Sequence, residues 1–574
     1  MARRPVPMKK VLGQVIVRFP WVVISAVFLW SVFSIVLRKE SEPSPGETVI
    51  RLAHWQLEPG VREGFAEIAA EYEKLHPGVR VIQQAIPEST YGQWLSTQLI
   101  GGTAPDIVEV GMVDYSLLLV FYSRYLLPLS PYITRPNPYN TGTEWEDAPL
   151  YSTFKNGMIH SFIPEIQEYM VMPLAMGSVR LFYNKTLLTE LTGLNAPPTE
   201  YRAFMEMIQV IQSKKMPNGQ PYAAFSGSRY HFSRLEDSMA NPLSYGTIRK
   251  IDFNRDGRFS NNEMFLGFLS GKIDFSDPSY MARFHMVEDL TKMFQSGWAG
   301  LSRDEGFFSF AQQRAVFTAA GIYENSAIQS QACSKFELGI MDFPVPNQDD
   351  PIFGRAFEGR RYEKPEGNMP MGIVRTSRHP DVAADFLLFL ASQKQNEKFN
   401  ALLKWIPIVK GAKIAPSLEV FEPNVNGVTS AFDPNAFGNS TVRWNQLYSL
   451  FLIHQIPYAD MAHEFTKFYI NDGRENFRKM LQNRRRSHSQ NEAILVGLRQ
   501  TILSGVEDSA KSAGNKYRTI LRRQIADEHN LLLQERIFTD PESAKGETLY
   551  KYTPEALENA RRRLNSSSSA ERFE

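Results

Sequence analysis

The sequence predicts an α/β fold, because short apolar strands alternate with amphipathic helices along its first part. Three runs rich in β-branched residues are the expected strands, at 48–53, 79–83 and 107–111. Between them, apolar side chains recur at helical spacing over 65–72 and 91–100. This alternation predicts a mostly parallel sheet with helices on both faces. The ligand crevice of such a sheet lies at the carboxyl ends of its strands.

Polar and aromatic residues follow the expected strand ends. His54 and Trp55 come directly after the first strand, and Asp114 and Tyr115 follow the third. Because the carboxyl ends of parallel strands meet at one edge of the sheet, these side chains are candidates for contact with a small ligand.

The composition indicates a large soluble body. A chain of 574 residues can bury two or more hydrophobic cores. With 43% hydrophobic and 22% charged residues, it is neither largely disordered nor a multi-span membrane protein. Residues 1–39 contain seven basic and no acidic residues, so the remainder has 56 basic against 62 acidic residues. Such a body excludes nucleic acid as an electrostatic partner. The single cysteine, Cys333, excludes an intrachain disulfide and is expected to be buried.

The N-terminus predicts a membrane anchor. Residues 19–37 are uncharged and nearly all apolar, and as a helix they match the bilayer core. Five basic residues in 1–18 favour a cytoplasmic N-terminus, with the main domain in the periplasm or outside, at the inner (cytoplasmic) membrane. No small-residue cleavage site and no lipid-bearing cysteine follow, and 38–47 is an expected linker. The alternative is a buried core helix.

Several segments in order resemble family 1 extracellular solute-binding proteins of ATP-driven sugar importers. The resemblance is carried by HWQLEPGVREGFAEIAAEYEKLHPGVRVIQQ, GTAPDIVEV, VRLFYNKTLLTELTGL, AAGIYENSAI, MGIVRTSRHPDVAADFLLFLAS and KWIPIVKGA, which lie between 54 and 412. The resemblance implies a two-lobe periplasmic-binding-protein type II fold over 48–483, with interleaved lobes, a hinge and a ligand held between the lobes. It also implies a carbohydrate ligand and permease subunits of an ABC importer as partners.

Five residues are candidates for ligand contact. Sugars stack their C–H faces on aromatic rings and direct their hydroxyls to a few polar groups. Trp55, Tyr323 and Trp405 match places where the family often has an aromatic contact; their alternative role is packing. Glu58 and Asp114 lie near expected strand ends, where a carboxylate can accept hydrogen bonds from hydroxyls. Their alternative role is that of solvated loop or helix-cap acids.

One segment, DFNRDGRFSNNE at 252–263, matches the twelve-residue calcium loop of an EF-hand. Gly257 allows the sharp turn at position 6, and the backbone carbonyl of Arg258 serves position 7. The candidate calcium ligands are Asp252, Asn254, Asp256, Arg258, Ser260 and Glu263. We expect a structural Ca²⁺ because no second matching loop is evident. The alternative is an Asx-rich surface turn before a helix.

The C-terminal part predicts helices followed by a flexible end. Apolar residues keep approximate helical spacing within 484–564, and 565–574 is expected to be disordered. The arginine runs 484–486 and 561–563 can meet acidic lipid headgroups, although such runs are more often solvated helix faces.

The predicted function is that of a binding protein without catalytic activity. The chain has no phosphate-binding G-x-x-x-x-G-K-[ST], no nucleophile elbow and no H-E-x-x-H, so any ATP hydrolysis belongs to partner subunits. Two alternatives remain open: a ligand-sensing subunit of a membrane signalling protein, and a glycan-active enzyme with two carboxylates at its cleft.

Overall fold

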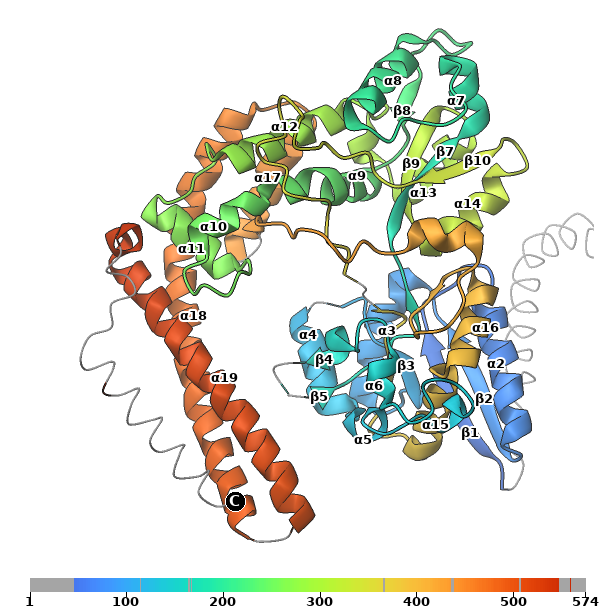
Figure 1. Ribbon diagram of the computed structural model, residues 1–574, viewed down its shortest axis with the longest axis vertical. Coiled ribbons are helices and arrows are strands. Elements are labelled where there is room, and N and C mark those ends of the chain that lie inside the picture. The colour runs from blue at the N-terminus through green and yellow to red at the C-terminus, as the bar shows by residue number, and fades with distance from the viewer. Residues whose placement is uncertain are drawn as a thin grey trace, which may run out of the picture.

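The protein comprises two lobes and a long helical hairpin (Figure 1). The computed structural model describes residues 46–113, 115–163, 166, 168–364, 367–434, 438–504, 507–546 and 558. The expected anchor at 19–37 and the expected disordered tail at 565–574 lie outside these residues. Within the described chain, no helix is both long and apolar enough to cross a membrane.

The first lobe is built on the sheet β12-β3-β1-β2, in which β1 pairs in parallel with β2 and β3. Its antiparallel edge, β12, arrives from much later in the chain. The main elements of this lobe are β1 Thr48–His54, α2 Val61–Leu75, β2 Val79–Ala85, α3 Glu88–Gly101, β3 Ile107–Glu109, β12 Met371–Ile373, α15 Pro380–Leu390 and α16 Gln393–Leu403. Its shorter elements are α4 Tyr115–Val120, α5 Ser130–Ile133, α6 Leu150–Thr153, β4 Phe162–Ile163 and β5 Glu168–Tyr169.

The helices of the first lobe form where the apolar spacing predicts them. The buried face of α2 includes Phe65, Ile68, Ala69 and Tyr72, which pack with α15 and α16 residues in one core. Gly60, directly before α2, has φ 91° and an added Cβ would lie 2.5 Å from the Leu402 carbonyl oxygen. The start of α2 therefore needs glycine to approach α16 closely.

The second lobe contains the sheet β10-β7-β9-β8 with helices around it. Only β8 runs parallel to β9, whereas β7 is antiparallel to both of its neighbours. Its elements are β7 Val179–Asn184, α7 Lys185–Thr192, α8 Tyr201–Ser213, β8 Ala223–Phe225, α9 Arg229–Leu235, α10 Ile248–Ile251, α11 Asn261–Ser270, α12 Pro278–Thr291, α13 Arg303–Ala311, β9 Ala315–Gly321, α14 Asn325–Ala332, β10 Leu338–Met341 and α17 Gly438–Leu452.

Three crossing segments join the lobes, and short strands pair at this junction. The three strands are β6 Ala175–Met176, β11 Gly367–Asn368 and β13 Ile406–Pro407, in the order β11-β6-β13. Next to them, the buried Arg180 donates to the Glu363 carboxylate at 2.7 and 3.1 Å. Its guanidinium also donates to the carbonyl oxygens of Val420 and Glu422. One side chain therefore ties the crossing segments together, and the predicted α/β class and two-lobe fold are confirmed.

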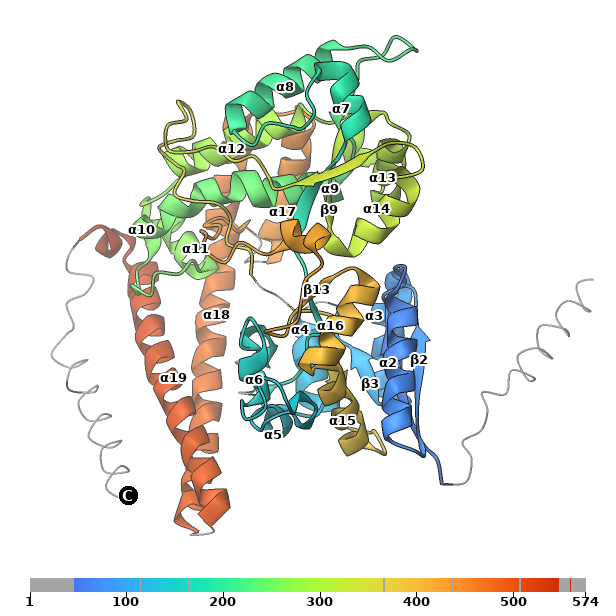
Figure 2. The same cartoon turned by 45° about the vertical axis from the view of Figure 1, so that its right-hand side comes forward.

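The C-terminal hairpin consists of α18 Tyr458–Leu503 and α19 Glu507–Thr539. Its base packs on α11 and α17 of the second lobe, and both views show it extending beside the first lobe (Figures 1 and 2). Lys516 Nζ lies 3.1 Å from Glu168 Oε1 of β5. The boundary expected between 483 and 484 falls inside α18, because the charge change there coincides with no helix-ending residue. Cys333, expected to be buried, is exposed at the end of α14.

Candidate functional site

Two hollows flank the short helix η7, Ile322–Glu324, where the second lobe faces the first. The hinge pocket measures about 370 Å³ and is lined by the junction and the second lobe, including Ser178, Arg234, Asp237, Tyr323, Arg361 and Asn368. The interlobe pocket measures about 170 Å³ and is lined by Glu58 of the first lobe and by Arg303, Phe307, Glu324 and Gln331 of the second. Together they form the candidate site.

Tyr323 is one of the residues that line the hinge pocket. Its hydroxyl is 2.9 Å from the Tyr230 hydroxyl, and the Arg234 guanidinium lies over the Tyr230 ring, 4.5 Å from its centroid. Tyr230 donates to Glu324 Oε2 at 3.2 Å. The pocket therefore presents half-buried aromatic surface next to fixed donors and acceptors, the combination that suits a hydroxyl-rich ligand.

Glu324 connects the two hollows. Its carboxylate accepts from the Gly321 backbone N–H at 2.9 Å, and its Oε1 forms a 2.7 Å ion pair with Arg303 Nε that is not aligned as a hydrogen bond. Burial raises the pKa of Glu324, whereas the positive charge of Arg303 opposes that rise. Arg303 also lies 3.6 Å from Glu88 Oε2 at the start of α3. The ion pair between Arg303 of the second lobe and Glu88 of the first therefore joins the two lobes next to the cleft.

The first-lobe side of the cleft contains a buried carboxyl that sequence patterns did not single out. Glu109, at the end of β3, accepts from Gln56 Nε2 at 2.6 Å and from the Trp55 backbone N–H at 3.2 Å. Burial raises the pKa of Glu109 to about 8. The available signal was a glutamate inside an otherwise apolar strand. By accepting these two hydrogen bonds, the Glu109 carboxyl holds in place the segment that leaves β1 toward the cleft.

A comparison with protein families identifies the chain's relatives. A family model described as bacterial extracellular solute-binding protein matches residues 58–397, more than half of the chain. The chain belongs to this family. A relative, the multiple sugar-binding protein of Streptococcus mutans, is 21% identical over 383 residues, which cover 65% of this chain and 78% of the relative. The family is one of binding proteins, not of enzymes.

Solved structures share the fold of this solute-binding protein. The apo form of RafE from Streptococcus pneumoniae matches with a TM-score of 0.52 and 17% identity, covering 75% of this chain and 99% of RafE. RafE in complex with raffinose matches with a TM-score of 0.51 and 16% identity, covering 74% and 99%. These matches agree with the two lobes described above.

The structure brings some of the predicted contact residues of this binding protein to the cleft. Tyr323 lines the hinge pocket and Glu58 lines the interlobe pocket. Glu58 Oε2 is buried with no hydrogen-bond partner in the described chain, and burial raises the pKa of this carboxyl. Asp114 lies outside the described residues.

The two predicted tryptophans are placed differently. Trp55 leaves the end of β1 and packs edge-on against Tyr91, with ring centroids 5.1 Å apart, and it lines neither hollow. An added Cβ at Gly111 would lie 2.7 Å from the Trp55 ring, so this glycine makes room for the indole. Trp405 requires a correction, since it is only 2% exposed and belongs to the core that the first lobe shares with part of the second. Its place next to β13, which pairs within the junction sheet, turns the ring inward.

The loop at 252–263 of this binding protein adopts a tight turn between α10 and α11. The backbone N–H groups of Asp256 and Gly257 each donate to the Asp252 carboxylate at 3.0 Å, and Gly257 has φ 72°. Glu263 is 1% exposed and accepts from the Ser260 hydroxyl at 2.6 Å. Among the described residues, no group of three or more His, Cys, Asp or Glu side chains is arranged to hold a metal ion. Three of the candidate calcium ligands in this loop are not of those four residue types, because an EF-hand loop also uses amide, hydroxyl and backbone oxygens.

Proposed function

We propose that this solute-binding protein captures a carbohydrate between its lobes and delivers it to the permease subunits of an ABC importer. In this proposal, residues 19–37 anchor the protein in the cytoplasmic membrane and the lobes lie outside the cytoplasm. Family membership supports the proposal, as do the relative named as a multiple sugar-binding protein and the shared fold with RafE, which was solved in complex with raffinose.

The hinge pocket carries the carbohydrate proposal. It combines the aromatic face of Tyr323 with the charged groups of Arg234, Asp237 and Arg361 in one hollow of about 370 Å³. A volume of this order accommodates a small sugar or the end of an oligosaccharide. Closure of the lobes around the ligand would remove water and strengthen these polar contacts.

The experiment is a titration of mono- and oligosaccharides into the purified full chain, followed by thermal shift and calorimetry. We expect at least one sugar to raise the melting temperature. Tyr323→Ala should weaken its binding about tenfold or more, because an aromatic contact at a desolvated centre is lost. Tyr151→Ala serves as the control, since this exposed tyrosine lies on the first lobe away from both hollows. Binding of peptides alone would exclude the carbohydrate proposal.

We also propose that the loop at 252–263 binds a structural Ca²⁺. The backbone turn around Asp252 and Gly257 supports it, together with the carboxyl of Glu263 at the last ligand position. Glu263→Gln should abolish a calorimetric Ca²⁺ signal and the rise in melting temperature on adding Ca²⁺. Glu190→Gln, on an exposed helix face, should leave both unchanged. An original protein that melts at the same temperature in Ca²⁺ and in chelator would contradict the proposal.

A further inference from the structure

The half of the hairpin that lies beyond the second lobe differs in charge from residues 46–483. Residues 484–524, which we call the hairpin tip, contain nine Lys and Arg residues against three Asp and Glu residues. Residues 46–483 instead contain 40 basic and 47 acidic residues. Arg486, Arg499 and Arg522 are all exposed in the hairpin tip. A basic element projecting from an acidic body is an electrostatic contact surface for an anionic partner.

The hairpin tip also exposes apolar side chains between its basic residues. Ile494, Val496 and Leu503 are 51%, 59% and 66% exposed, and they lie within the last turns of α18. Basic side chains interleaved with exposed aliphatic ones are typical of elements that lie at the headgroup region of a bilayer.

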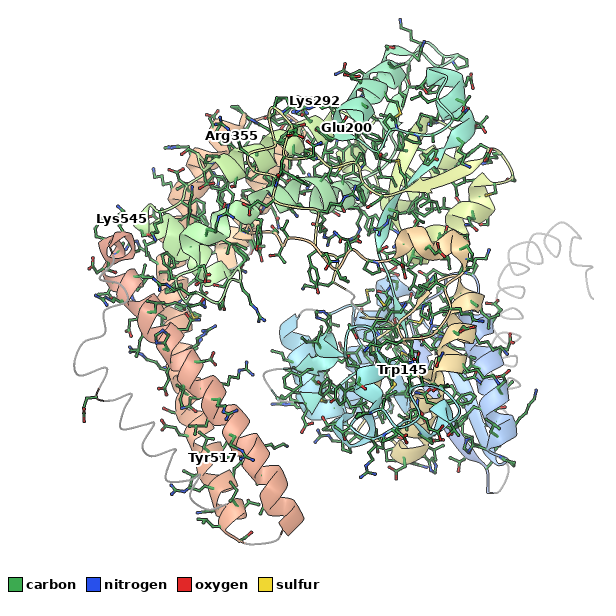
Figure 3. All side chains as sticks on the ribbon, in the orientation of Figure 1. Trp145, Glu200, Lys292, Arg355, Tyr517 and Lys545 are labelled. Carbon is green, nitrogen blue, oxygen red and sulfur yellow. The ribbon has the colours of Figure 1, made fainter. Side chains whose placement is uncertain are left out.

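The position of the hairpin tip indicates which partner it meets. Helix α18 has 46 residues and is therefore roughly 70 Å long, enough to run from the second lobe past the first. Both ribbon views show the tip and the start of β1 at the same end of the molecule (Figures 1 and 2). Tyr517 of α19 lies toward this end, whereas Lys545 lies at the opposite end of the hairpin (Figure 3).

The sequence before β1 places a membrane near the same end. Nine residues separate the apolar run 19–37 from Glu47, and a chain of that length spans at most about 30 Å. We propose that the hairpin tip binds the anionic lipid surface of the membrane that residues 19–37 span. This inference rests on the anchor of the proposed function for its orientation and is independent of the sugar. The protein would then contact the membrane at two places, the anchor and the hairpin tip.

The test uses the full chain reconstituted in lipid vesicles with an environment-sensitive fluorophore. Cys333→Ser removes the exposed native thiol, and Val496→Cys places the label in the hairpin tip. We expect emission to shift to the blue and rise at least twofold in vesicles containing phosphatidylglycerol, relative to phosphatidylcholine alone. High salt should reverse the change, because it screens the headgroup charge.

Two controls separate tip binding from anchoring. A label introduced by Arg355→Cys, on the second lobe far from the tip (Figure 3), should give the same emission in both vesicles. The combined change Arg486→Glu, Arg499→Glu and Arg522→Glu should remove the lipid response while the protein still floats with vesicles. Loss of flotation would count against the anchor. Equal emission from Val496→Cys in both lipids, or a response only when permease subunits are added, would overturn the lipid proposal.

Discussion

Three carboxyl groups face or underlie the cleft in environments that favour their neutral forms. Burial raises the pKa of Glu58, Glu109 and Glu324. Among the described residues, Glu324 is the one of the three that forms an ion pair, with Arg303. Burial therefore makes each of these groups easier to protonate than an exposed glutamate, and a protonated carboxyl can donate as well as accept a hydrogen bond.

Glu109 should make the stability of the protein depend on pH. Its pKa rises from 4.5 to about 8 on folding, so the unfolded chain releases this proton first as the pH increases. The stabilising contribution is complete below about pH 4.5 and is lost by about pH 8. Between pH 5.5 and 7.5 the original protein should therefore lose roughly 2 kcal/mol more of its free energy of unfolding than Glu109→Gln loses.

Denaturant titrations at the two pH values measure this difference. The comparison is made between variants because Glu263, whose pKa burial raises to about 7, titrates in the same range. An equal decrease in stability in both proteins would show that Glu109 is already ionised in the fold.

The residue level also shows where sequence patterns succeed and where they do not. Tyr323 and Glu58 follow strand ends, and topology alone brings such positions to the cleft. Trp405 also follows a family-like motif, but which way its ring points depends on the pairing of β13 with β6, a contact more than 200 residues away in sequence. The sequence did not identify Glu109 as a site residue, because a polar residue within an apolar strand gives no indication of the groups that it will contact.

At the level of elements, α18 depends on a close approach to α11. An added Cβ at Gly473 would lie 2.3 Å from the Phe265 ring, whereas at Gly497, in the same helix, nothing lies within 4 Å. Gly473→Ala should lower the free energy of unfolding by about 2 kcal/mol through overpacking. Gly497→Ala should raise it by up to about 1 kcal/mol through helix propensity. Denaturant unfolding followed by circular dichroism measures both free energies. Equal effects would show that the Phe265 ring moves aside at little cost.

Element types were predictable where the apolar period is clear, as for the first three strands and two helices. The helix that the alternative to a calcium site places after the loop at 252–263 forms as α11. The extent of α18 was not predictable, because its first half is covered by the second lobe and its second half is solvated. A change in charge marks that transition in environment, but the backbone hydrogen bonding continues through it.

For the whole molecule, the contact between Arg303 and Glu88 should bias the opening of the lobes. Glu88→Lys would place two positive charges at the cleft mouth and favour separation. We expect a larger radius of gyration in solution scattering without ligand and roughly two- to fivefold weaker sugar binding, the size expected for a partly exposed ion pair. Glu63→Lys is a matched control, since Glu63 is also a first-turn glutamate of a first-lobe helix. Identical behaviour of the two variants would assign no role to this pair in closure.

The three crossings have a consequence for how the protein is made. Synthesis completes the four strands of the second-lobe sheet once Met341 has emerged, whereas the first-lobe sheet waits for β12, which ends at Ile373. The sheet that begins first is therefore completed last. Until then, β3 offers an unpaired edge to other chains. A chain that emerges from β1 onward exposes that edge until β12 pairs with it, and any product truncated before β12 would retain it permanently.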